Sequence, residues 1–278
     1  MSLDVVVPAL RSATIDRLLS SLAAGTVRPD AVSLVSNEVQ AGIETYGLEV
    51  RLLRFRSDRY PIGDRDVALR RAICLWSSAC SHVLMLDDDV VAPANLVETS
   101  LDLLTREPYF WGHHRYVSFD GYAPERLLDL PAQLGRPREK PPNSWHLWLS
   151  CYGGAFGAER ALVQELGGFD LAFSCRHGGE DQSLGKRLAV ETTGREQVFI
   201  HEPPFAWHPT EAEPWGAPGY SNLCRGGHEL EQAELNGLPV SSCRRCPYFA
   251  ALDEELLFSG EVFVPYDPDA VEVTVRKA

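Results

Sequence analysis

The sequence predicts an α/β fold with a mostly parallel, doubly wound sheet. Short apolar runs such as Asp4–Val7 and Val32–Val35 are typical of strands that are buried on both faces. Between these runs, Ile15, Leu18 and Leu22 recur at the three- and four-residue spacing of one helix face. Strands that alternate with helices from the start of the chain indicate parallel strands joined by helical crossovers.

The other elements continue this alternation. Val83–Leu86 is expected as the central strand, and Leu69, Ile73 and Trp76 mark the helix before it. Residues 120–143 are rich in proline, arginine and leucine without a clear period, so we expect a long loop, a frequent form of active-site lid. Further strands are expected at Val50–Leu53, Tyr116–Phe119 and Val198–Ile200, and further helices at Leu96–Leu104, Ala158–Leu166 and Glu180–Leu188.

The composition of the chain changes near residue 210, where proline, glycine and tryptophan precede a polar stretch. We therefore expect a main domain over residues 1–209 and a C-terminal extension over residues 210–278. The strand-rich part of the extension, Phe258–Val275, is expected to return to the main domain. A chain of 278 residues is long enough for one large α/β domain with a small appendage.

Composition and charge argue against several classes of protein. Hydrophobic residues make up 45% of the chain, yet no apolar run approaches the roughly 20 residues of a membrane helix. The formal net charge of -13 argues against a non-specific nucleic-acid binder. The N-terminus lacks the basic region of a signal peptide, so we expect a cytoplasmic protein with its seven cysteines reduced. Neither the glycine-rich dinucleotide fingerprint nor a P-loop is present in the sequence.

The central strand leads directly into three consecutive acids, Asp87, Asp88 and Asp89. Open α/β sheets bind their ligands at the carboxyl ends of their strands. Adjacent carboxylates repel one another, and a divalent cation that prefers oxygen ligands, Mg²⁺ or Mn²⁺, would balance their charge. On these residues alone, a solvated acidic turn is an equal alternative.

Several segments of the chain, in a fixed order, resemble a known family. They are the opening DVVVPAL, which contains Pro8, then Ser36-Asn37-Glu38, GDRDVAL at 63–69, the aspartates at 87–89, GGFD at 167–170 and GED at 179–181. Their order and spacing resemble those of the family 2 glycosyltransferases, which have the GT-A fold and use nucleotide-sugar donors. The resemblance covers roughly residues 3–209.

The resemblance implies a nucleotide site built from the first three segments. Pro8 ends the opening strand, and Asn37 or Glu38 stands where the family has an acidic residue that contacts the base. Arg65 and Asp66 would help to cradle the nucleotide, with Asp66 in place of the family's usual asparagine. From charge alone, an ordinary surface ion pair is the alternative for Arg65.

The resemblance also implies a metal at the aspartates. Asp87 would meet the ribose, Asp89 would hold Mn²⁺ or Mg²⁺, and Asp88 would do either. A second metal ligand is expected at His208, with His201 as the competing candidate and a packed histidine as the plain alternative.

The Glu180-Asp181 pair would face the acceptor. A carboxylate within hydrogen-bond reach of the acceptor hydroxyl can accept its proton, so Asp181 is the expected general base and Glu180 its neighbour in the site. A base opposite the leaving group implies inversion of the sugar. The alternative is that both acids only cap and charge the start of a helix.

Aromatic and glycine residues precede the acceptor-side motifs. Trp145, Trp148 and Tyr152 are candidates for stacking on a sugar ring, or for ordinary aromatic packing. Gly153 and Gly154 indicate either a close approach of the backbone to a substrate or a tight bend.

A possible second metal site, unrelated to the resemblance, lies in the extension. Cys224, His228, Cys243 and Cys246 have a spacing that suits a structural Zn²⁺, which would staple a segment with little core of its own. Unligated cysteines are the alternative.

These observations predict a metal-dependent glycosyltransferase that moves a single sugar from a nucleotide sugar, UDP-sugar first, to an acceptor hydroxyl. The Q-x-x-R-W signature of processive members is absent. Two alternatives stay open: a sugar-1-phosphate nucleotidyltransferase, and a nucleotide-sugar-binding protein without turnover. The first needs a G-x-G-T-R loop after the first strand, where this chain has Pro8-Ala9-Leu10-Arg11-Ser12.

Overall fold

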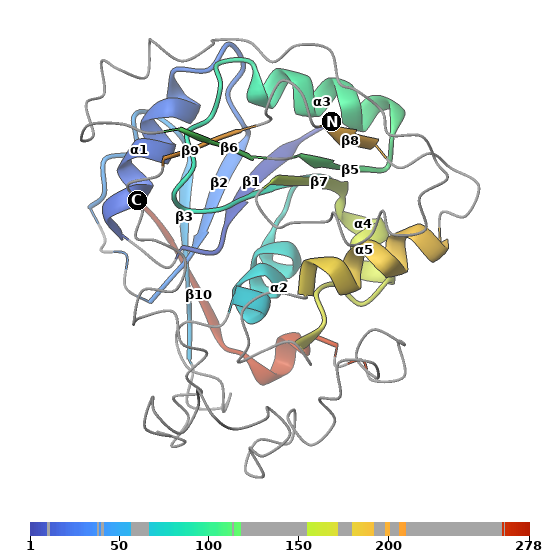
Figure 1. Ribbon diagram of the computed structural model, residues 1–278. Coiled ribbons are helices and arrows are strands. Elements are labelled where there is room, and N and C mark those ends of the chain that lie inside the picture. Colours follow the sequence, from blue (N-terminus) through green and yellow to red (C-terminus); the bar gives the residue numbers. More distant parts are fainter. Residues whose placement is uncertain are drawn as a thin grey trace, which may run out of the picture.

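Within the part of the chain that the structure describes, the central element is a sheet of eight strands. The computed structural model describes residues 1–9, 12–37, 39, 42–56, 67–112, 114–117, 155–171, 180–191, 198–200, 206–209, 263 and 265–278. The strands are β1 (Leu3–Val7), β2 (Ala31–Val35), β3 (Val50–Phe55), β4 (His82–Leu86), β5 (Tyr109–Gly112), β7 (Ala155–Glu159), β8 (Val198–Ile200) and β10 (Val273–Lys277). Their order across the sheet is β10-β3-β2-β1-β4-β7-β5-β8 (Figure 1).

The sheet is mostly parallel, as the sequence predicts. β1 pairs in parallel with β2 and β4, and β3 and β8 continue the same direction on the two sides. β7 runs antiparallel to both of its neighbours, β4 and β5, and β10 runs antiparallel to β3. The carboxyl ends of β2, β1 and β4 therefore lie next to one another at one edge, which positions the residues that follow them.

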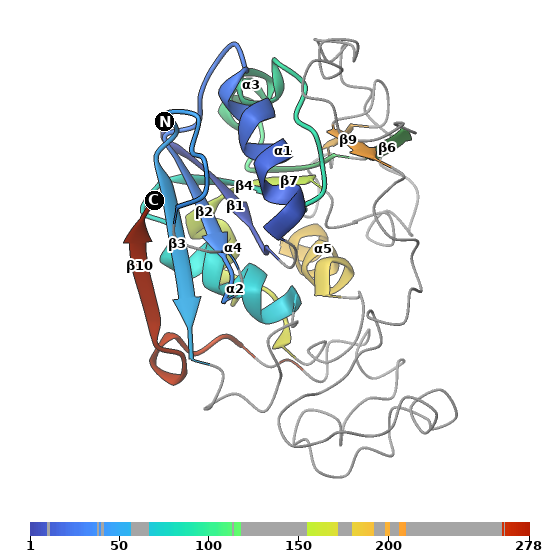
Figure 2. The ribbon, with the colours of Figure 1, turned by 90° about the vertical axis from the view of Figure 1, so that its left-hand side faces the viewer.

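Helices cover both faces of the sheet, which makes three layers (Figures 1 and 2). The helices α1 (Ser12–Ala23) and α3 (Leu96–Arg106) pack on one face through a core that contains Leu18, Val5 and Phe110. On the other face lie α2 (Val67–Ser77), α4 (Arg160–Glu165) and α5 (Glu180–Glu191). Their core includes Ile73, Val163 and Leu184 from the helices, and Val6, Met85 and Trp111 from the strands.

Two predictions for the middle of the sheet were wrong. No strand was expected at β5, and a helix was expected to begin at Ala158, which is a residue of β7. The helix α4 begins two residues later, at Arg160. Gly157 interrupts the apolar pattern by which β7 could be predicted from the sequence, yet the packing of the sheet requires a glycine at this position. A Cβ at Gly157 would lie 2.2 Å from Cε1 of Phe110 on β5, so the ring occupies the space that a side chain would fill.

A separate two-stranded sheet lies outside the main one. It consists of β6 (His114–Val117) and β9 (Ala206–Pro209), which pair in parallel. The strand expected at Tyr116–Phe119 thus begins earlier and belongs to this small sheet.

The end of the chain returns to the main sheet. β10 pairs with β3 from Val273 opposite Phe55 to Lys277 opposite Arg51, and a short 3₁₀ helix (Pro268–Ala270) precedes it. Tyr266 is buried in the core beside Trp76, with ring centroids 6.1 Å apart. The strand expected in this segment therefore forms the edge of the sheet. The division of the chain at residue 210 stays a prediction.

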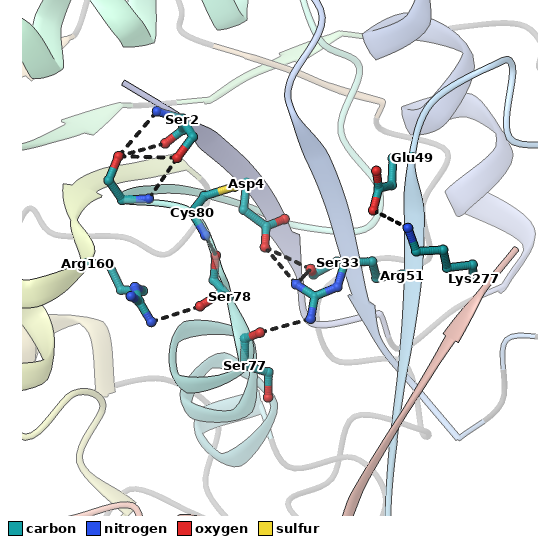
Figure 3. Close-up of polar contacts among 11 residues, drawn as sticks. Ser2, Asp4, Ser33, Glu49, Arg51, Ser77, Ser78, Cys80, Arg160 and Lys277 are labelled. Atoms are coloured by element: carbon teal, nitrogen blue, oxygen red, sulfur yellow. Dashed lines mark hydrogen bonds and ion pairs between the residues drawn. The ribbon is translucent and has the colours of Figure 1, made fainter.

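A buried polar cluster lies at the amino end of β1 (Figure 3). The carboxylate of Asp4 accepts a hydrogen bond of 2.8 Å from the hydroxyl of Ser33, and it lies 3.6 Å from Nη1 of Arg51. Arg51 donates to the carbonyl of Ser77, and Arg160 donates to the next carbonyl. Both arginines thus satisfy carbonyls at the end of α2, where cations are favourable.

Among the described helices, none is long and apolar enough to span a bilayer.

Candidate functional site

The aspartates form a turn directly after β4, at the edge where β1 and β2 also end. Residues 83–86 of β4 are fully buried or nearly so, which fixes the position of the backbone that leads into the turn. Asp88 and Asp89 are 3% and 4% exposed, whereas the side chain of Asp87 is 30% exposed. Asp87 is therefore the member of the triplet most open to solvent.

The Glu180-Asp181 pair forms the first turn of α5. Two acids at a helix N-terminus interact favourably with the helix dipole. The side chain of Glu180 is 4% exposed and that of Asp181 is 11% exposed, so both carboxylates lie largely within the protein.

The GGFD segment holds α5 in place. Gly167 and Gly168 adopt φ of +81° and +73°, the left-handed region that favours glycine. Arg187 of α5 donates to the carbonyls of Leu166 and Gly168, the second at 2.7 Å. Burial lowers the pKa of Arg187 to about 10, and the charge of Asp170 only partly offsets this effect. The turn and the helix are therefore joined by charged hydrogen bonds from Arg187.

One arginine joins the two acidic segments. Arg71 of α2 donates from Nη1 to Oε1 of Glu180 at 2.6 Å and from Nη2 to Oδ1 of Asp87 at 3.2 Å. Oδ2 of Asp181 lies 3.8 Å from Nη1, within ion-pair range but beyond hydrogen-bond distance. The guanidinium carbon also lies 5.9 Å from the centroid of the Phe169 ring. The aspartate, GGFD and Glu-Asp segments thus meet around a single side chain.

The surroundings of Arg71 keep it charged. Burial on its own would lower the pKa of the guanidinium, but the charges of Glu180, Asp87 and Asp181 outweigh burial and raise the pKa above its ordinary value. A buried cation among several carboxylates is the arrangement that makes such burial tolerable.

A second buried arginine supports the ends of β1 and β2. Arg70 is fully buried, and its Nη1 donates to the carbonyls of Ala9 at 2.7 Å and Val35 at 2.8 Å. The carboxamide of Asn37 accepts from the backbone N–H of Phe55 at 3.2 Å. Pro8 and Asn37, both expected in the nucleotide site, therefore lie at the same edge of the sheet as Asp87.

The other candidate residues lie outside the described residues or are described only in part. His208 is a residue of β9 paired with Tyr116, and nothing is described of its side chain. The residues outside the description are Glu38, Arg65, Asp66, Trp145, Trp148, Tyr152, Gly153, Gly154, His201, Cys224, His228, Cys243 and Cys246. Their assigned roles stay predictions.

The carboxylates of the triplet suit a hard divalent cation in their chemistry, because oxygen donors are the preferred ligands of Mg²⁺ and Mn²⁺. Within the described part of the chain, no group of three or more His, Cys, Asp or Glu side chains is arranged to hold a metal. A cation held by Asp89 would therefore need a further ligand whose side chain is not among those described. His208 is the ligand that the sequence predicts.

Sequence analysis did not single out Arg70 and Arg71. A signal was present, because Ala68 and Leu75 lie three residues before and four residues after Arg71, on the same face of the helix. A charged residue in the apolar face of a helix needs a partner of opposite charge, and the chain offers two acidic motifs, at 87–89 and 180–181.

The sequence matches no family model and no curated protein. Solved structures match in fold. The structure of S. aureus TarS 1–349 matches with a TM-score of 0.54 and 14% identity, over 75% of this chain and 60% of that chain. The complex of TarS 1–349 with UDP-GlcNAc matches with a TM-score of 0.52 and 15% identity, over 75% of this chain and 58% of that one. GalNAc-T7 with UDP, GalNAc and Mn²⁺ matches with a TM-score of 0.54 and 16% identity, over 77% and 45%.

This chain spans about 60% of the length of TarS 1–349. At identities of 14–16% the likeness concerns the fold alone. These neighbours are glycosyltransferases of the GT-A type, and the chain described here has the GT-A fold.

Proposed function

We propose that this protein is a metal-dependent glycosyltransferase that moves a single sugar from a nucleotide sugar to an acceptor hydroxyl, with inversion. The observation that carries the proposal is the meeting of Asp87, Glu180 and Asp181 around Arg71 beside the carboxyl end of β4. A donor-side acid and an acceptor-side acid within reach of one guanidinium can face the same sugar from its two sides.

The donor is a UDP-sugar in this proposal, with GDP- and dTDP-sugars as the next candidates. The complexes of TarS with UDP-GlcNAc and of GalNAc-T7 with UDP and Mn²⁺ support this choice. Pro8 and Asn37 lie along the edge of the sheet that leads from the base to Asp87, which meets the ribose. Asp89 and His208 hold the cation, and Asp88 contacts the ribose or the cation.

Asp181 is the general base. Glu180 is engaged by Arg71 at 2.6 Å, and a carboxylate in so short a charged hydrogen bond is a weaker proton acceptor. Asp181 lies at 3.8 Å from the same nitrogen, and its side chain is more exposed, at 11% against 4%. Asp181 is therefore the better placed of the two to accept a proton from an acceptor.

The reaction is a single displacement. The acceptor oxygen attacks the anomeric carbon and passes its proton to the carboxylate of Asp181. The bond from the anomeric carbon to the diphosphate oxygen breaks, and the nucleoside diphosphate leaves from the opposite face. A divalent cation bound at this site supplies stabilisation of the negative charge that develops on the diphosphate.

A thermal-shift panel of UDP-glucose, UDP-GlcNAc, UDP-GalNAc and GDP-mannose, with and without Mn²⁺, tests the donor. A ligand at 100 times its Kd adds about 2.7 kcal/mol to the free energy of unfolding, so one donor is expected to raise Tm clearly when Mn²⁺ is present. Chelation with EDTA should remove the shift. A panel without any Mn²⁺-dependent shift would contradict the proposal.

The products of slow donor hydrolysis separate the proposal from its alternatives. A glycosyltransferase releases nucleoside diphosphate, whereas a nucleotidyltransferase given sugar 1-phosphate and nucleoside triphosphate releases pyrophosphate, and a binding protein releases neither. Asp89→Ala should abolish the Mn²⁺-dependent shift. Asp181→Asn should keep the shift and lose turnover by about 100-fold or more, the range of general-base catalysis. Loss of donor binding in Asp181→Asn would show that its role is assigned wrongly.

A further inference from the structure

Arg71 is a charged residue in a position where the helix pattern calls for an apolar one. Its side chain is 6% exposed, and Ala68 and Leu75 flank it within the core on the face of α2 that packs against the sheet. Burial of a guanidinium is costly unless carboxylates compensate it. An apolar side chain at this position would carry no charge to compensate, so the packing of α2 alone gives no reason for an arginine here.

The contacts of Arg71 come from two elements that are distant in the sequence. Its two terminal nitrogens bind different carboxylates, Asp87 after β4 and Glu180 at the start of α5, with sequence separations of 16 and 109 residues. Figures 1 and 2 show α2 and α5 side by side on one face of the sheet. The planar fork of an arginine places two donor nitrogens at separate, fixed positions, whereas the three N–H groups of a lysine share one nitrogen.

Without this cation the two acidic segments would repel each other. Asp87, Asp88 and Asp89 on one side and Glu180 and Asp181 on the other are five formal negative charges on two short segments. Like charges in a buried setting interact strongly because the local dielectric is low. A cation between the segments offsets part of that repulsion and fixes the distance between Asp87 and Glu180.

We propose that Arg71 is a positioning residue of this site. It sets the distance between the donor-side Asp87 and the acceptor-side Asp181, and it holds Glu180 in a structural ion pair. This inference rests on the proposed function. Arg71 acts through the two carboxylates and not on the substrate. A displacement of about 1 Å between reacting groups can reduce a rate by about 100-fold, so the expected effect lies in turnover and not in donor affinity.

The first arm of the test is independent of activity. Arg71→Met leaves the buried Glu180 without its cation, so its Tm should fall by about 6 °C or more. The double variant Arg71→Met/Glu180→Gln also removes the charge of Glu180, the most buried of the carboxylates that Arg71 contacts, and should recover at least half of that loss. If the double variant is no more stable than Arg71→Met, Arg71 and Glu180 are not coupled and the inference is overturned.

The second arm uses Arg71→Lys, which keeps the charge but replaces the two separately placed donor nitrogens by one. With Mn²⁺ and the nucleotide sugar that stabilises the wild type most, the donor Kd should change by less than about threefold. The kcat for release of nucleoside diphosphate should fall by about 100-fold. Arg160→Lys is the matched control, because Arg160 is a partly buried arginine that donates to the carbonyl of Ser78, and its kcat should stay at the wild-type value.

The two arms separate the two possible failures. A wild type that neither binds a nucleotide sugar nor releases nucleoside diphosphate refutes the proposed function. The Tm values of Arg71→Met and the double variant then still show whether Arg71 and Glu180 are coupled. A wild type that turns over, together with an Arg71→Lys variant within threefold of its kcat, overturns the positioning role. Equal changes in kcat and Kd would do the same, since they indicate a general loss of structure.

Discussion

The contact between the GGFD turn and the C-terminal segment can be tested with three glycines of nearly equal φ. Gly47, Gly167 and Gly168 have φ of +74°, +81° and +73°, so alanine meets the same backbone strain at each of them. That strain is about 1–2 kcal/mol for an L-residue in the left-handed region. What differs is the space for a Cβ, and the difference in stability therefore measures that space.

The surroundings of the three positions rank the losses. At Gly47 the nearest atom to a Cβ would be Nη1 of Arg28 at 3.4 Å, the end of a flexible side chain. At Gly168 it would be Nε1 of Trp76 at 3.2 Å. At Gly167 it would be Cζ of Phe263 at 2.6 Å, closer than packed atoms approach, and overpacking of this kind costs about 1–3 kcal/mol. Gly47→Ala should thus lose about 1 kcal/mol, Gly168→Ala slightly more and Gly167→Ala about 3 kcal/mol.

Urea unfolding of the three variants measures these losses, with the slope m as a check that the unfolded state is unchanged. In a Phe263→Leu background, the loss caused by Gly167→Ala should shrink because the smaller side chain leaves room. Equal losses for Gly47→Ala and Gly167→Ala would refute the argument, and so would a Gly167→Ala loss that is the same with Phe or Leu at position 263. Either result would mean that Phe263 does not pack on the turn.

Two further predictions concern buried charges. Burial raises the pKa of Asp4, and the hydroxyls of Ser78 and Ser33 and the charge of Arg51 offset this only in part. A raised carboxyl pKa stabilises the folded protein below the ordinary value of about 4, and this contribution is lost as the pH rises through the raised value. The free energy of unfolding of Asp4→Asn minus that of the wild type should therefore increase with pH above about 4, and a difference independent of pH would count against the buried carboxylate. Arg187→Lys should lose about 2 kcal/mol in urea unfolding, because the single nitrogen of lysine cannot occupy the positions of both Nη1 and Nη2, which donate to the carbonyls of Leu166 and Gly168. Arg106→Lys, at an exposed pair with Asp102, should change the free energy of unfolding by less than about 0.5 kcal/mol. An equal loss in both variants would contradict the stabilising role of the hydrogen bonds from Arg187 to the GGFD turn.

The sequence predicts the elements whose periodicity is not interrupted. The apolar run of β4 and the spaced leucines of α1 correspond to elements that are observed, and the mostly parallel sheet follows from their alternation. β5 and β7 were missed because their pairing depends on Gly157 and Phe110, which are 47 residues apart and have no local signal that links them.

The acidic residues of the candidate site could be predicted from the sequence, but Arg71, which joins them, could not. Asp87 and the Glu180-Asp181 pair stand out because each is an acidic group next to a regular element. Arg71 is an interior residue of α2, and its role depends on a partner 109 residues later in the chain. A pattern of residues along a helix shows that such a charge is buried, but only the fold shows which carboxylates it meets.

The antiparallel pairing of β10 with β3 has a consequence for synthesis. Residues 273–277 leave the ribosome after every other described element, so β3 has an open edge until then. An open edge invites pairing with other chains, and charges along it discourage that. Arg51 and Arg54, the two partly exposed residues of β3, place positive charge on this edge strand during that interval. These charges are expected to disfavour association of the nascent protein through β3 until β10 pairs with it.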